Sequence, residues 1–157
     1  GAVTSYVHAG GRIGVIVKFD TSDEIASSAA FQTYAHNVAM QIAALNPEYL
    51  DENAVPADRV EKEKAILTEQ IVGDGKPANI AEKIVAGRLN KFFKEICLVD
   101  QVYVQDSSMT VKQYTESVAK ELGGEIKIAA YTRFEKGEGL EKRDDSNYAQ
   151  EIAELVK

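Results

Sequence analysis

Cysteine, histidine and long apolar runs are all scarce in this chain of 157 residues. The single cysteine, Cys97, can form neither an internal disulfide nor a zinc site of several thiolates, and it fits a reducing, cytoplasmic setting. The two histidines, His8 and His36, have no Asp, Glu or Cys at ligand spacing, so we predict no metal site. No apolar stretch is long enough to cross a membrane, and no basic-then-apolar leader opens the chain, so we expect no membrane association.

Positive charge is also in short supply. Eighteen Lys and Arg against 25 Asp and Glu give a formal net charge of -7, and no basic run interrupts the sequence. A protein that wraps nucleic acid needs a concentrated basic face, so we expect no direct nucleic-acid partner. Hydrophobic residues make up 45% of the chain, which is typical of a globular protein of one domain or two fused lobes.

The motifs of common enzymes are missing as well. The segment 73–76 (Gly-Asp-Gly-Lys) is a poor phosphate loop, because Pro77 stands where Ser or Thr is required and no strand precedes it. Cys97 has no evident histidine partner, and no nucleophile elbow occurs. We therefore predict no catalytic residues and no cofactor, and a small-molecule enzyme is the least favoured function.

The N-terminal part predicts a β-hairpin followed by a helix. Gly10-Gly11 separates a short strand at Tyr6-Val7 from a strand over 12–19, as in a tight turn. In the second strand Ile16 lies opposite the apolar face, so we expect both sides of this strand to be covered. Capping oxygens at 21–23 precede a helix that ends at Asn46-Pro47, with His36 and Gln41 outside its apolar stripe: Phe31, Ala35, Val38, Ala39, Ile42 and Leu45.

The middle of the chain predicts two charged helices joined by a Gly/Pro loop. The first begins at Pro56, the second runs over about 78–96, and the break lies at 73–77. Their apolar seams are narrow, which favours a protruding two-stranded coiled coil. The seam positions are Val60, Leu67 and Ile71 on the first helix and Ile80, Ile84, Leu89, Phe92, Phe93 and Ile96 on the second.

The last third predicts a helix, a strand and a tail helix. Gly123-Gly124 ends the helix, the strand over 125–134 alternates with Ile126, Ile128, Ala130, Thr132 and Phe134 on one face, and the tail over 143–157 is amphipathic. The fold class is therefore α+β: a three-stranded antiparallel sheet packed on helices, with an inserted antiparallel helical hairpin. Residues 1–47 and 105–141 form the core, 48–104 the hairpin region and 142–157 a C-terminal helical module.

Several segments, taken in order, resemble signatures of the elongation factor Ts family: His8 to Val17, Val38 to Pro47, Gly75 to Leu89, and Arg133 to Gly139 with Glu141-Lys142. The resemblance implies a protein that is not itself an enzyme. Members of this family promote GDP/GTP exchange on the GTPase elongation factor Tu during protein synthesis. It also implies that this chain corresponds to the C-terminal subdomain, with a coiled-coil dimerisation hairpin and a C-terminal module.

Candidate site residues follow from this resemblance. Contacts with elongation factor Tu fall on the turn at His8, Gly10 and Arg12, on Val104, and on Leu155 of the C-terminal module. The residues of a possible homodimer through the hairpin are Ile80, Ile84, Leu89 and Phe93.

One segment departs from the family pattern. The family's exchange wedge is a Thr-Asp-Phe-Val motif, whereas this chain has Thr21-Ser22-Asp23-Glu24, with Glu24 in place of the aromatic residue. The chain also begins without Met, so we expect a fragment whose wedge lies upstream. Binding without much exchange is the expected behaviour, and a stand-alone dimerising coiled-coil scaffold is the alternative.

Overall fold

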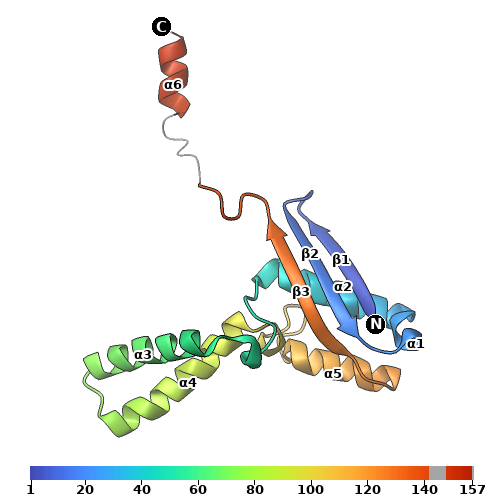
Figure 1. Cartoon of the computed structure of the whole chain (residues 1–157), viewed down its shortest axis with the longest axis horizontal. Helices are drawn as coiled ribbons and strands as arrows, with labels where there is room; N and C mark the ends of the chain where they lie inside the picture. The colour runs from blue at the N-terminus through green and yellow to red at the C-terminus, as the bar shows by residue number, and fades with distance from the viewer. Residues whose placement is uncertain (142–147, 157) are drawn as a thin grey trace.

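The computed structural model describes residues 1–141 and 148–156. It confirms the α+β class, the antiparallel sheet and the helical hairpin, whereas the division into domains stays a prediction (Figure 1). Its strands and α-helices are β1 (Ala2–His8), β2 (Ile13–Asp20), α1 (Asp23–Ala26), α2 (Ala29–Leu45), α3 (Ala57–Gly73), α4 (Ala78–Ile96), α5 (Val111–Leu122), β3 (Lys127–Glu135) and α6 (Tyr148–Leu155).

The sheet has the order β1-β2-β3, with both pairs antiparallel. The first strand is longer than the predicted Tyr6-Val7, because its whole length pairs with β2. Helices α2 and α5 lie on one side of the sheet (Figure 1). The expectation that β2 is covered on both sides is wrong: Ile16 is 50% exposed, and Val3, Val7 and Phe134 are also exposed.

The core forms where β2 meets α2. Val15, Val17 and Phe19 point from the strand into this layer, because alternate residues of a strand share one face. Phe19 packs against Phe31 and Tyr34 of α2, with ring centroids 5.3 and 5.6 Å away. These buried rings anchor the sheet to the helix.

Strand β3 does not keep a single alternation. Lys18 pairs with Ala130, but Phe19 pairs with Ile128, so Ala129 is an extra residue in the strand. This bulge reverses the face of all later residues. Ile128 is buried, whereas Ala130, Thr132 and Phe134 are exposed, which corrects the prediction of one common face.

The expected helix after β2 is divided in two. Ser22 caps α1 and Ser28 caps α2, each accepting a hydrogen bond at 3.2 Å from a backbone N–H three residues later. Helix α2 ends at Leu45, as the Asn46-Pro47 pair predicts, and Asn46 caps it in a left-handed conformation with φ 47°. Further along the chain, Thr110 and Gln113 form a capping box that starts α5.

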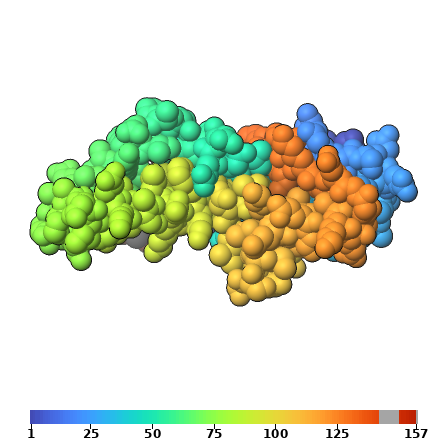
Figure 2. Space-filling view, turned by 90° about the horizontal axis from the view of Figure 1, so that it is seen from below, coloured from blue at the N-terminus to red at the C-terminus, as the bar shows by residue number. Residues whose placement is uncertain are grey.

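The helices α3 and α4 form an arm that extends from the body (Figure 2). Their seam is formed by Leu67 and Ile71 on α3 and by Ala81 and Val85 on α4. The prediction that Ile80 belongs to the seam is wrong, because this side chain is 47% exposed. At the base of the arm a second cluster buries Val55, Ile96 and Cys97 against Tyr49, Val60, Phe92 and Phe93.

Candidate partner-binding site

The turn between β1 and β2 is an exposed loop of unusual backbone conformation. Three successive residues, Ala9, Gly10 and Gly11, have positive φ values of 51°, 65° and 96°, which glycine adopts freely and which is uncommon for Ala9. The backbone N–H of Arg12 donates to the carbonyl of His8 at 3.0 Å, and Lys136 donates to the carbonyl of Arg12 at 2.8 Å. The turn is therefore tied to the end of β3 while its side chains face solvent.

His8 lies at the base of this turn and is exposed. Its Nδ1 lies 2.8 Å from the hydroxyl oxygen of Tyr6. The second histidine, His36 on α2, meets the same Tyr6 ring edge-on, with 5.2 Å between centroids. Sequence reasoning placed both histidines but missed Tyr6 as their common neighbour, because only the packing of β1 on α2 brings them together.

Val104, the second predicted contact, lies on a loop whose conformation is set by a buried amide. The carbonyl oxygen of the Gln41 side chain accepts from the N–H of Val104 at 2.9 Å, and its amide nitrogen donates to the carbonyl of Val102 at 3.1 Å. Gln41 thus pairs with the loop as a neighbouring strand would. Tyr103 points inward and stacks on Tyr114 with 4.2 Å between centroids, so Val102 and Val104 point outward, 49% and 47% exposed.

Gln41 itself is fully buried, although the sequence placed it outside the apolar stripe of its helix. Its amide also donates to the side-chain oxygen of Gln101 at 3.3 Å. No periodicity reveals such a residue, because a glutamine outside a stripe is normally solvated. The one available signal was that it falls among otherwise small and apolar residues.

The C-terminal module presents an apolar surface in the part that the structure describes. Leu155 is 86% exposed, and Ile152 and Val156 are exposed as well. The packed body therefore gives Leu155 little cover, and the structure does not bring it together with the turn or with Val104. Asp144, Asp145 and Ser146 suit the N-terminus of a helix by sequence, but they lie outside the described residues.

The four predicted dimerisation residues occupy different environments. Ile80 is exposed near the tip of the arm, whereas Ile84, Leu89 and Phe93 are half-buried within the hairpin or at its base. Of the four, Ile80 alone is well exposed on the single chain.

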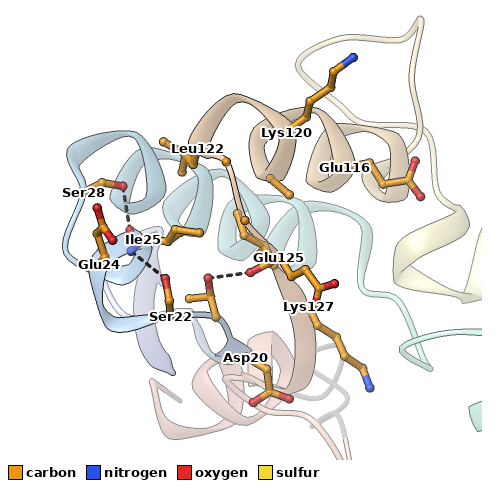
Figure 3. Close-up of a pocket in the computed structure, with 15 residues that line it drawn as sticks. Asp20, Ser22, Glu24, Ile25, Ser28, Glu116, Lys120, Leu122, Glu125 and Lys127 are labelled. Atoms are coloured by element: carbon orange, nitrogen blue, oxygen red, sulfur yellow. Dashed lines mark hydrogen bonds between the residues drawn. The ribbon is translucent and has the colours of Figure 1, made fainter.

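The segment Thr21 to Glu24, which follows β2, borders an open groove of about 1220 Å³ (Figure 3). Thr21 donates to the carbonyl of Glu125 at 2.8 Å, and Ser28 donates to the carbonyl of Ile25 at 2.7 Å, so these hydroxyls hold the loop in place. Ile25 is buried against Gly124, where an added Cβ would lie 2.5 Å from its Cδ1. The loop is therefore fixed, and Glu24 is an exposed carboxylate at its edge.

The groove is lined by charges of both signs. Carboxylates of Asp20, Glu116 and Glu125 line it together with Lys120 and Lys127. Across residues 1–141 and 148–156 no three His, Cys, Asp or Glu side chains converge as a metal site would require. Within the same residues no helix is long and apolar enough to span a membrane.

Comparison with known proteins gives the family. Residues 1–138 match the sequence profile of the family described as elongation factor TS. The elongation factor Ts of Desulforamulus reducens is 44% identical over 158 aligned positions, which cover all of this chain and 72% of the relative. That of Acetivibrio thermocellus is 45% identical, with 99% and 73% covered, and that of Clostridium kluyveri is 45% identical, with 100% and 50% covered. The chain thus spans between half and about three quarters of these relatives, and it belongs to the elongation factor Ts family.

Proposed function

We propose that this chain binds elongation factor Tu and supports GDP/GTP exchange on it, acting through that partner GTPase in the cytoplasm and not as an enzyme itself. The observation that carries this proposal is the turn over residues 8–12 in a chain of this family. It combines an exposed imidazole, an exposed guanidinium and a backbone free of side chains at Gly10 and Gly11. Such a surface offers both side-chain and backbone groups to a partner.

The outward-facing valines of the 102–104 loop support a second contact. Helix α2 borders both regions, since His36 lies against Tyr6 and Gln41 holds the loop. Exposed apolar side chains on a rigid backbone bind at a low entropic cost, because little conformational freedom is left to lose. We propose that the turn and Val104 contact elongation factor Tu together, and that Leu155 adds a separate contact from the C-terminal module.

A binding titration with matched variants tests this proposal. Calorimetry with elongation factor Tu and GDP should give complex formation at micromolar concentration, and Arg12→Ala and Val104→Asp should each weaken it. Gln32→Ala, an exposed change on the far side of the α2 stripe, is the control and should bind as the wild type does. Failure of the wild type to bind would contradict the proposed function.

Dimerisation through the hairpin is the second candidate, favoured by the arm-like shape of α3 and α4 and the exposed Ile80 (Figure 2). Ile80→Asp is the sharpest variant, because substitution of the half-buried Leu89 or Phe93 would also disturb the hairpin itself. Light scattering should then show a dimer for the wild type and a monomer for Ile80→Asp. A wild type that stays monomeric at high concentration would rule out this second function.

A further inference from the structure

Tyr6 is a fixed point at the base of the exposed turn. It packs against the main core, and its ring meets His36 edge-on at an interplanar angle of 85°. Its hydroxyl group reaches His8, whose ring centroid lies 5.7 Å from that of Tyr6. An exposed imidazole at the end of a strand would otherwise sample several rotamers, so the hydroxyl restricts where the His8 ring lies.

The same contact bears on which nitrogen of His8 carries the proton, because the roles of donor and acceptor depend on the tautomer. A neutral imidazole has one N–H donor and one unprotonated acceptor nitrogen. A phenol hydroxyl is an effective donor, whereas its oxygen is a weak acceptor because its lone pair is delocalised into the ring. Donation from Tyr6 to Nδ1, 2.8 Å away, therefore leaves the proton of His8 on Nε2.

Resting on the function proposed above, we propose that Tyr6 is a positioning residue that fixes His8 in its Nε2–H tautomer. The turn then presents one oriented N–H donor to an oxygen acceptor on elongation factor Tu. A Cβ built at Gly10 or Gly11 meets no atom within 4 Å, so the space beside the donor is open to an approaching backbone. Because the ring is ordered before binding, the complex loses less entropy when it forms.

The tautomer is measurable on the free chain. A long-range ¹H–¹⁵N spectrum at pH 8.5, where imidazole is neutral, reports which nitrogen of each histidine is protonated. We expect Nδ1 of His8 to have the shift of an unprotonated nitrogen. In Tyr6→Phe the His8 shifts should move towards those of a mixture of tautomers, in a folded protein. A protonated Nδ1 in the wild type, or His8 shifts that do not change in Tyr6→Phe, would overturn the proposal.

Binding to elongation factor Tu tests the donor role. The side-chain amide of glutamine reaches the position of Nε2, whereas that of asparagine reaches Nδ1. His8→Gln should therefore retain most of the affinity and His8→Asn should lose it as His8→Ala does. Tyr6→Phe should weaken binding about two- to tenfold, the scale expected when one side chain must be ordered on binding.

A double-mutant cycle separates positioning from a general structural role. In a His8→Ala background Tyr6→Phe should change affinity by less than about twofold, because its effect acts through His8. An equal loss of affinity from Tyr6→Phe with and without His8 would overturn the positioning role of Tyr6. Equal losses in His8→Gln and His8→Asn would overturn the donor role of His8. A wild type that does not bind would overturn the proposed function and the donor role together, while the tautomer measurement would still stand.

Discussion

Cys97 illustrates how burial decides the chemistry of a single residue. Its side chain is fully buried, and burial raises the pKa of the thiol to about 12, helped by the nearby carboxylates of Asp100, Glu52 and Asp51. The thiolate is the reactive form of cysteine, so on the order of one molecule in ten thousand carries it at pH 8. Cys97 therefore packs as a small buried hydrophobe.

We therefore expect Cys97 to resist alkylation. Iodoacetamide at pH 8 should leave the native chain unmodified and should modify it fully once it is unfolded in denaturant, as mass spectrometry would show. An exposed control, Ser107→Cys in a Cys97→Ser background, should react within minutes. Native Cys97 reacting as fast as this control would contradict the burial described here.

Glu48 and Arg59 join the base of the arm to the body. The guanidinium donates hydrogen bonds to the carboxylate of Glu48, and it also lies 5.3 Å from the ring centre of Tyr49 and 5.7 Å from that of Phe92. The hydrogen bonds from Arg59 lower the pKa of Glu48 below its ordinary value of 4.5. The charged form of Glu48 is thus stabilised by folding.

The stability that ionised Glu48 contributes therefore depends on pH. A lowered pKa contributes stability that is present above pH 4.5 and is lost as the pH falls through the pKa in the folded state. Glu48→Gln should lower the melting temperature at pH 7, by an amount worth less than about 1 kcal/mol for so exposed a pair. The difference should shrink towards pH 3. A difference in melting temperature that stays constant from pH 7 to pH 3 would contradict this prediction. Glu61→Gln, an exposed change on α3, is the control.

At the scale of elements, Gln41 links α2 to the loop that carries Val104. Gln41→Leu keeps a side chain of similar size but leaves the N–H of Val104 and the carbonyl of Val102 without this partner. Removing such buried partners should cost about 2–3 kcal/mol of the free energy of unfolding. Urea denaturation measures this loss, and hydrogen exchange should show the amide of Val104 opening before the core.

The matched change Gln32→Leu concerns an exposed glutamine of the same helix. It loses one hydrogen bond, from its amide to the carbonyl of Ala26, and should cost less than about 1 kcal/mol. If both variants lost the same stability, the amide of Gln41 would not be what holds the loop.

The elements show what the sequence could predict and why the rest required the structure. The apolar stripe of α2, the Gly/Pro break of the hairpin and the Gly-Gly turn of β1 and β2 are local signals, and each gave the right element. The bulge at Ala129 was missed because it depends on how β3 pairs with β2. The seam through Ala81 in place of Ile80 was missed because hydrophobicity alone does not fix which face of a helix packs.

The candidate site was predictable only in part. His8, Gly10 and Arg12 were proposed from a family resemblance, and the structure places them together on one exposed turn. Tyr6 and Gln41, which orient these surfaces, could not be found from spacing. Tyr6 acts through the packing of β1 on α2, and Gln41 acts through its hydrogen bonds to the 102–104 loop. Both contacts exist only once these segments have packed on α2.

At the scale of the whole molecule, we expect docking on elongation factor Tu and nucleotide exchange to depend on different parts of the protein. The turn and the 102–104 loop are presented by the folded body, whereas the segment Thr21-Ser22-Asp23-Glu24 ends in an exposed carboxylate and contains no aromatic residue. A carboxylate cannot replace a phenylalanine ring in an apolar pocket without a large desolvation cost. Docking should therefore be retained in this chain while exchange is weak.

The most direct test measures release of a fluorescent GDP analogue from elongation factor Tu by stopped flow, at concentrations of this chain that saturate the complex in a parallel titration. We predict that the chain binds and yet accelerates GDP release far less than a full-length elongation factor Ts does. Saturated binding with full acceleration would contradict this prediction, because exchange would then not require the Thr-Asp-Phe-Val wedge that this sequence lacks.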